Sequence, residues 1–475
     1  MTAKIWIILA AGLLCYQGEC QEAVLHVSNG SLIKEYCLVY NSSWSNISDS
    51  LSNAVRYELV NMTHSVLCDE SGVTPGSLVG KAVAVMKGNC TFSQKAQVAQ
   101  KLGAAVLLIA VSRLANDTEI EKVNIPLALM RYRDFVFPEK AEVQLYAPPI
   151  PAFDVSILVM LALAVFTVGM GGFWSGAAER EKLNAGPVLS GGEERADSGD
   201  LSLYSPLKVL LFVVLMCGML VLMYFFYKWL VYVIIVIFCL ASATALYSCL
   251  DALMNAIGCG KLSVSCGERS CSLRSLLLAA VCITLAVVWG VYRNEDRWIW
   301  ILQDLLGVAF CLNFMKTITL SNYKICVILL CLLLVYDVFF VFITPFFTPN
   351  SYMSVCVFQL PVVMRVPRFS AWAQNLCGMQ FSILGYGDII VPGLLVAYCH
   401  RFDVWINSSN RIYFISCTIA YCVGLVVTFV VMLLSKMGQP ALLYLVPFTL
   451  ITSAVVACSR KEFRQFWAGT TYQQL

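Results

Sequence analysis

The chain has 475 residues, of which 59% are hydrophobic and 13% are charged, and its formal net charge is +3. Average soluble proteins have about 45–50% apolar and about 25% charged residues, so this composition excludes an ordinary soluble enzyme and indicates a polytopic membrane protein. A net charge this small, without a basic stripe, excludes nucleic acid as the expected partner.

The N-terminus has the pattern of a secretory signal peptide. Lys4 precedes an apolar run, Ile5 to Leu14, that is too short to span a bilayer, and the small residues Gly18 and Cys20 suit a cut after Cys20. We therefore expect residues 1–20 to be removed and the following residues to lie in the lumen. A signal anchor is the alternative.

Residues 21–150 are predicted to form a soluble lumenal α/β domain. Strands are expected at 81–86 and 104–110, with a helix at 93–102 between them. In the oxidising lumen, three cysteines permit one disulfide and leave one thiol, and the sequence does not assign the pair. These cysteines are Cys37, Cys68 and Cys90.

The same domain is rich in N-glycosylation sequons, which is consistent with a glycosylated lumenal surface. The six sequons begin at Asn29, Asn41, Asn46, Asn61, Asn89 and Asn116. We see no cluster of nucleophile, base and metal ligands here. The domain is therefore interpreted as a binding or scaffolding module, with an inert folded cap as the alternative.

Nine apolar segments follow a proline-rich hinge at 148–151, and each is long enough to cross a bilayer core of about 30 Å. Their predicted limits are 153–173, 207–227, 229–249, 273–292, 298–315, 325–347, 372–398, 412–435 and 439–458. Residues 153–458 are thus predicted to be a polytopic α-helical membrane domain. Polar residues 174–206 are expected to form a cytosolic linker, and 459–475 a cytosolic tail.

The orientation follows from the signal peptide, because a lumenal N-terminus and an odd number of spans place the C-terminus in the cytosol. Loops assigned to the cytosol hold more Lys and Arg than loops assigned to the lumen, which agrees modestly with this orientation. Asn407 also begins a sequon, but this topology places it in the cytosol, where we expect no glycan.

Asp337 and Asp388 lie near the middle of two of the predicted spans. An ionisable side chain near the middle of a span costs roughly 2.5–3.5 kcal/mol on insertion scales and is usually functional. Gly385 and Gly387 precede Asp388 and allow the backbone to leave helical geometry, which lipid tolerates only beside protein or water. We predict that both acids share a hydrated site; the alternative is that each only hydrogen-bonds neighbouring helices.

A pair of adjacent carboxylates can perform acid–base chemistry. Two carboxylates about 3 Å apart share a proton because both cannot ionise cheaply. The ionised member can take a proton from water while the protonated member polarises a peptide carbonyl, and the pair titrates as a unit.

Three short motifs in the membrane domain resemble the signatures of intramembrane aspartyl proteases, the signal peptide peptidase and presenilin relatives. They are Tyr336-Asp337, Gly385-Tyr386-Gly387-Asp388 and Gln439-Pro440-Ala441-Leu442. The resemblance covers roughly residues 150–460. It implies that Asp337 and Asp388 are the catalytic pair, and that Pro440, Ala441 and Leu442 shape the active site and help to present an unwound substrate.

The lumenal segment Gly80 to Phe92, with Lys95-Ala96 and Gly103-Ala104, resembles the protease-associated domain. Together with the signal peptide it narrows the resemblance to the signal peptide peptidase-like 2 group. This group implies hydrolysis of the transmembrane segments of type II single-pass proteins after ectodomain shedding, with release of an intracellular fragment. No metal or organic cofactor is implied.

The last four residues, Tyr472 to Leu475, fit a tyrosine-based sorting signal for a cytosolic adaptor and resemble the 2A-type branch of the group. We expect a membrane location in late endosomes and lysosomes, with the plasma membrane and other endosomes as alternatives. Membrane lipid and type II substrates are the other expected partners, and a homo-oligomer is left open.

A metal site is not expected. Cys259, Cys266 and Cys271 lack the paired spacing of structural zinc sites and are interpreted as reduced or lipidated thiols. Two other functions would also use intramembrane acids: a proton-coupled transporter or channel, and a catalytically inactive protein that binds substrates. Neither alternative explains the three ordered motifs together with the lumenal domain.

Overall fold

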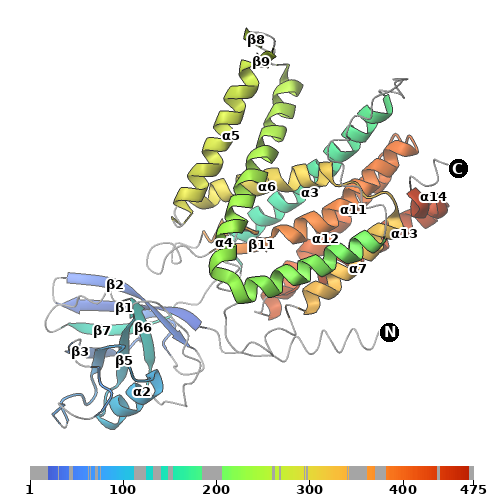
Figure 1. The fold of residues 1–475 in the computed structure, drawn as a ribbon. Helices are drawn as coiled ribbons and strands as arrows, with labels where there is room; N and C mark the ends of the chain where they lie inside the picture. Colours follow the sequence, from blue (N-terminus) through green and yellow to red (C-terminus); the bar gives the residue numbers. More distant parts are fainter. Residues whose placement is uncertain are drawn as a thin grey trace. The chain divides into compact units, whose positions relative to one another are not determined.

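The chain divides into two units, residues 1–154 with 368–380 and residues 155–367 with 381–475, and each is described by itself (Figure 1). The structure is a computed structural model. It describes residues 20–29, 32–41, 47–62, 64, 66–69, 73–74, 76–111, 125–131, 141–147, 153–184, 206–258, 263–266, 269–293, 295, 298–339, 341, 361–369, 381–435 and 439–469. Of the predicted signal peptide only Cys20 is among them, as the first residue of β1.

The N-terminal unit is a closed barrel with strand order β1-β2-β6-β5-β4-β3-β7. The elements are β1 (Cys20–Asn29), β2 (Leu32–Asn41), a 3₁₀ turn (Leu51–Asn53), β3 (Arg56–Met62), β4 (Ala82–Met86), α2 (Phe92–Lys101), β5 (Val106–Val111), β6 (Leu127–Arg131) and β7 (Glu142–Tyr146). Strands β3, β4, β5 and β6 pair in parallel, and the other pairings are antiparallel.

The predicted β-α-β unit is confirmed as β4, α2 and β5. All six residues of β5 are buried, because one face of the strand fills the barrel core and the other packs in the cluster that includes α2. Strands buried on both faces lose the alternation of apolar and polar residues. The closure of the sheet into a barrel was not predicted, since strand pairing is not encoded in any one segment.

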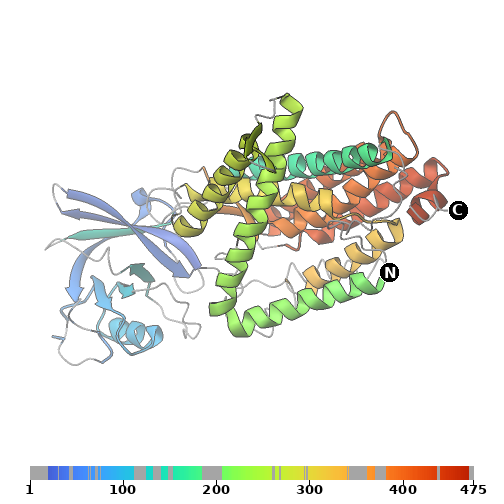
Figure 2. The ribbon, with the colours of Figure 1, turned by 45° about the horizontal axis from the view of Figure 1, so that its top comes forward.

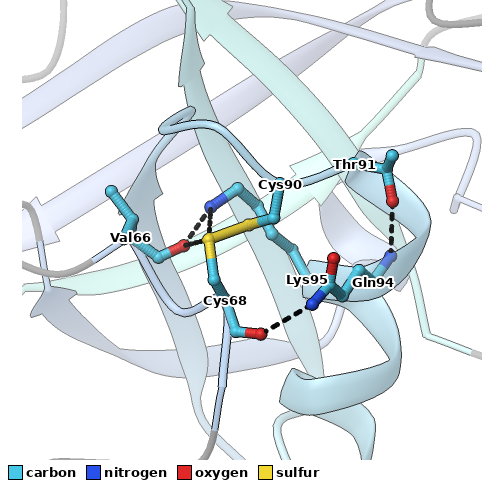
Figure 3. The surroundings of a disulfide bond; sticks show 6 residues. All are labelled: Val66, Cys68, Cys90, Thr91, Gln94 and Lys95. Carbon is cyan, nitrogen blue, oxygen red and sulfur yellow. Dashed lines mark hydrogen bonds between the residues drawn. A yellow bond between two sulfur atoms is a disulfide. The ribbon is translucent and has the colours of Figure 1, made fainter.

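A disulfide joins Cys68 to Cys90 beside a fully buried lysine (Figure 3). The ammonium group of Lys95 donates a hydrogen bond to the carbonyl of Val66 and lies 3.9 Å from Cys68 Sγ. Burial lowers the pKa of Lys95 to about 8. The lysine therefore still carries its charge at neutral pH, and it ties α2 to the segment that the disulfide closes.

Cys37 is disulfide-bonded as well. Because Cys68 and Cys90 are bonded to each other, the partner of Cys37 is a cysteine outside these three. The expected disulfide among these three cysteines is therefore confirmed, whereas the expectation that the third is a free thiol is wrong. It counted only the cysteines of the lumenal segment, whereas the chain has 21.

The described part of the membrane unit is a bundle of helices with two small antiparallel sheets, β8-β9 and β10-β11, and a short last helix, α14. Its elements are α3 (Val155–Asn184), α4 (Pro206–Ile257), β8 (Ser263–Cys266), β9 (Arg269–Ser272), α5 (Leu273–Tyr292), α6 (Ile299–Thr317), α7 (Tyr323–Val338), β10 (Val363–Pro367), β11 (Phe381–Gly385), α11 (Tyr386–Trp405), α12 (Ile412–Ser435), α13 (Leu442–Ser459) and α14 (Phe463–Ala468). Within the described part of the chain, six helices are long and apolar enough to cross a membrane: 155–184, 229–257, 273–292, 299–317, 412–435 and 442–459.

The predicted count of nine spans is therefore not confirmed. Segments 207–227 and 229–249 fall on either side of a kink in α4 at Phe226, where the backbone is not helical, so α4 consists of two helices that meet there (Figures 1 and 2). The predicted span 325–347 contains α7, which has 16 residues.

Two predicted boundaries are also wrong. Helix α3 continues to Asn184, into the segment expected to be a linker from residue 174, because 177–183 is rich in good helix formers such as Ala, Glu and Leu. The predicted span 372–398 does not begin as a helix within its described part: residues 381–385 form β11, and α11 runs from Tyr386 to Trp405.

Helices α3 and α11 pack closely along a row of glycines on α3. A Cβ atom at Gly172 would lie 3.0 Å from Val396 of α11, and one at Gly176 would overlap the ring of His400. The His400 ring is buried and its Nδ1 lies 3.0 Å from the carbonyl of Gly172. Small residues thus allow the two backbones to approach, as is typical of helices packed in membranes.

The last helix, α14, is anchored by Phe466. The centroid of its ring lies 4.5 Å from the ring centroid of Tyr323 on α7 and 5.1 Å from that of Tyr413 on α12. The hydroxyl of Tyr398 on α11 donates to the carbonyl of Phe466 at 2.6 Å. A buried aromatic cluster therefore joins α7, α11 and α12 at the end where α14 docks.

We expect Cys68→Ala to destabilise the lumenal barrel by about 3 kcal/mol, because the disulfide closes a loop with a sequence separation of 22 residues. A urea titration of the full-length protein, followed by proteolysis of residues 21–150, measures the effect. Cys458→Ala, which removes an exposed free thiol, is the control and should leave the midpoint unchanged. Equal midpoints for both variants would contradict the prediction.

Candidate active site

Asp388 is the third residue of α11, whereas the sequence had suggested the middle of a span. Asp337 lies in α7, and Phe339 and Val341 after it still have helical geometry of the π type. Both side chains are partly buried. The position of Asp388 in a first helical turn is favourable for an anion, because the helix dipole is positive there.

The two carboxyl groups share one site. Helices α7 and α11 contact each other, and the charge of Asp337 acts directly on the carboxyl of Asp388. Two like charges in such an arrangement resist simultaneous ionisation, so a proton is held more easily by the pair than by either group alone. The bundle thus brings together residues that are fifty-one positions apart in the sequence (388 − 337).

The third motif contributes a backbone amide. The N–H of Leu442, the first residue of α13, donates to Asp337 Oδ2 at 3.3 Å. First-turn amides of a helix have no partner within the helix, so a carboxylate from another helix can cap them. Pro440 and Ala441 are buried just before this turn, and proline itself has no N–H that would need a partner.

Gly385 and Gly387 leave room beside Asp388. A Cβ atom at Gly385 would lie 3.2 Å from Asp388 Oδ2, so a larger residue would press on the carboxylate. Gly387 is exposed, and no atom lies within 4 Å of the Cβ position. The hydroxyl of Tyr421 on α12 donates to the backbone carbonyl of Asp388 at 3.4 Å, which holds the residue from the other side.

Tyr386, between these glycines, is buried against α6. Its hydroxyl donates to the carbonyl of Gln303 at 3.1 Å. Its ring occupies the space where a side chain at Gly307 would be, since a Cβ atom there would overlap the phenol. The start of α11 is therefore fixed to α6 through one aromatic side chain.

A two-stranded antiparallel sheet leads into the site. β10 pairs with β11, with Val363 opposite Gly385, and the N–H of Tyr386 donates to the carbonyl of Val362 at 3.0 Å. Two side chains of α6 hold β10: Gln303 Nε2 donates to the Val363 carbonyl at 2.8 Å, and Asp304 Oδ1 accepts from the Arg365 N–H at 2.9 Å. Strand, helix start and Asp388 thus form one connected unit.

The remaining predicted residues divide between described and undescribed parts of the chain. Tyr336 is partly buried beside Asp337, and Asn29, Asn61 and Asn89 are exposed on the lumenal barrel. Asn41 is the last residue of β2. The sequons Asn46 and Asn116 and the sorting-signal residues Tyr472 and Leu475 lie outside the described residues. Among the described residues, no group of three His, Cys, Asp or Glu side chains could hold a metal ion.

Sequence reasoning missed three residues that shape the site, Gln303, Asp304 and Gly307. The signal for Asp304 was available, because it is another acid within a predicted span, 298–315, and such residues are rare in membrane helices. Gly307 gave no signal, since nothing in the sequence shows that it faces Tyr386.

We expect Gly307→Ala to destabilise the membrane unit by about 1–3 kcal/mol, because the added methyl group collides with the phenol of Tyr386. Thermal unfolding in detergent measures this loss. Gly218→Ala on α4 is the matched control, since no atom lies within 4 Å of its Cβ position. If the two variants unfolded at the same temperature, the contact between Gly307 and Tyr386 would be unimportant.

Comparison with known proteins agrees with this geometry. The signal peptide peptidase family model matches residues 197–473, and the PA domain model matches residues 55–135. The chain is 48% identical to signal peptide peptidase-like 2A of Mus musculus, over 98% of this chain and 94% of the relative.

Two further relatives show a similar coverage. Signal peptide peptidase-like 2A of Homo sapiens is 47% identical over 98% of this chain and 93% of its own. Signal peptide peptidase-like 2B of Gallus gallus is 44% identical over 96% of this chain and 81% of its own. The chain is an integral membrane protein that belongs to the signal peptide peptidase family of intramembrane proteases, within the signal peptide peptidase-like 2 group.

Proposed function

We propose that this protein is an aspartyl endopeptidase that hydrolyses the transmembrane segments of type II single-pass membrane proteins, after their ectodomains have been shed, and releases an intracellular fragment. The observation that carries the proposal is that α7 and α11 contact each other and that the carboxyl groups of Asp337 and Asp388 interact electrostatically. Family membership supports the class of reaction.

The pair would act as a general acid and a general base. One carboxylate takes a proton from water, the water oxygen attacks the peptide carbonyl, and the protonated carboxyl donates to the carbonyl oxygen. Collapse of the tetrahedral intermediate breaks the C–N bond, and the amine leaves with a proton returned by the pair. The Leu442 amide would hold Asp337 in orientation throughout.

A helical substrate must unwind before it can be cut, because each carbonyl in a helix is occupied by the amide four residues on. The strand β11 ends at the first glycine of the motif and continues directly into α11. An unwound substrate could therefore add to the sheet by backbone pairing. It would then present its peptide bond to Asp388, two residues beyond Tyr386, and to Asp337.

The lumenal orientation of the N-terminus, glycosylation of the lumenal barrel and delivery to late endosomes and lysosomes belong to the same proposal. Exposure of Asn29, Asn61 and Asn89 supports their use as glycan acceptors, since an acceptor must be reachable. The final Tyr472 to Leu475 would be read by a cytosolic sorting adaptor. No cofactor enters the reaction.

We expect Asp337→Ala and Asp388→Ala each to lower the release of an intracellular fragment by about 10²-fold or more, because each removes one partner of the acid–base pair. The measurement uses a tagged, pre-shed type II stub co-expressed with the protein at matched levels. Asp251→Ala, which removes a carboxylate at the far end of α4, is the control and should leave release unchanged. Undiminished release by both active-site variants would reject the proteolytic mechanism and favour a transporter.

We expect Tyr472→Ala to move the protein from lysosomal membranes to the plasma membrane, because the tyrosine is the residue that the adaptor would bind. Surface biotinylation and fractionation measure the distribution. Thr471→Ala is the neighbouring control. An unchanged distribution of Tyr472→Ala would remove the sorting signal from the proposal and leave the catalytic part untouched.

A further inference from the structure

We propose that Gln303 and Asp304 of α6 are positioning residues: they close one edge of the β10–β11 sheet, so that an unwound substrate can pair only with the free edge of β11. This fixes which peptide bond reaches Asp337 and Asp388. The inference rests on the proposed function, because it assigns the strand-docking step of that reaction to a particular edge.

The two α6 side chains bind the edge of β10 that faces away from β11. The Tyr386 N–H donates to the Val362 carbonyl, so the backbone groups of Val362 and Met364 point toward β11. Groups alternate along a strand, so the carbonyl of Val363 and the N–H of Arg365 point the opposite way. These two groups are the ones that an added strand would use, and Gln303 and Asp304 occupy them at 2.8 and 2.9 Å.

Burial makes this arrangement strong. Gln303 is 4% exposed and Asp304 is 7% exposed, and the strand residue Val363 is also buried. A backbone carbonyl or amide left without a partner at such a position costs several kcal/mol. A substrate strand would have to break these bonds to enter on this side.

The opposite edge of the sheet lies on β11. By the same alternation, the outward backbone groups of β11 belong to Phe381, Ile383 and Gly385, because Ser382 and Leu384 are paired with β10. Gly385 stands immediately before the Tyr386-Gly387-Asp388 run and has no side chain to keep a strand away. Among the described residues no further strand pairs with this edge, and an unpaired edge is a template for β-augmentation.

Gln303 also connects the blocked edge of β10 to the catalytic pair. Its side chain holds β10, while its backbone carbonyl accepts from the hydroxyl of Tyr386 at 3.1 Å. Tyr386 is two residues from Asp388. A shift of β10 relative to α6 would therefore displace both the docking strand and the start of α11, and the substrate would be cut at another bond.

The test is the position of cleavage, determined by mass spectrometry of the products from a defined type II stub in detergent. Asp304→Leu removes the acceptor for the Arg365 amide, whereas Asp304→Asn keeps an acceptor oxygen and loses the charge. We expect Asp304→Leu to lower the rate about tenfold and to spread cleavage over neighbouring bonds. Asp304→Asn should restore the single wild-type product.

Asn313→Leu removes an amide side chain elsewhere on α6 and is the matched control. This variant should cut at the wild-type bond. Gln303→Met, which keeps nearly the same volume, tests the second hydrogen bond and replaces Asp304→Leu if that variant does not fold. Folding is checked by thermal unfolding and by binding of an aspartyl-protease transition-state analogue.

A folded Asp304→Leu or Gln303→Met protein that cuts only at the wild-type bond would overturn the inference. That outcome differs from failure of the proposed function. If the edge assignment fails, cleavage still depends on Asp337 and Asp388 and yields one product; if the proposed function fails, cleavage does not depend on either acid.

Discussion

The requirement that every backbone amide and carbonyl inside a bilayer find a partner within the protein governs the active site. The chain leaves helical geometry there, between β10 and the first turn of α11, so groups that a continuous helix would pair internally need other partners. Asp304 accepts from one amide, Gln303 donates to one carbonyl, and Asp337 accepts from the first amide of α13. The polar side chains of the site therefore serve the backbone as well as the chemistry.

The same sharing applies to the acids. Asp337 on α7 meets the amide of the first residue of α13, which has no partner within its own helix. Asp388 lies in the first turn of α11, where the helix dipole favours negative charge. Breaking the helices therefore places partners for charge where charge is needed.

The sequence predicted the class of fold and the identity of the acids, because both depend on local features. Apolar segments of the right length predicted α5 and α12 at their observed limits, and the alternation of strand and helix patterns predicted β4, α2 and β5. It failed where the outcome depends on distant partners. The strand β11 reads as part of an apolar span, and only its pairing with β10 makes it a strand. By contrast, the kink at Phe226 lies close to the boundary that the sequence predicted between two spans.

The contact between Tyr386 and Gly307 has a consequence for the history of the family. The phenol occupies the volume that any side chain at position 307 would need, so neither residue can be exchanged without regard to the other. A lineage that acquired a larger residue at 307 would first have to lose the aromatic ring at 386, and the second change alone would leave a void beside α6. The effects of substitutions at the two positions, seventy-nine apart in the sequence (386 − 307), therefore depend on each other.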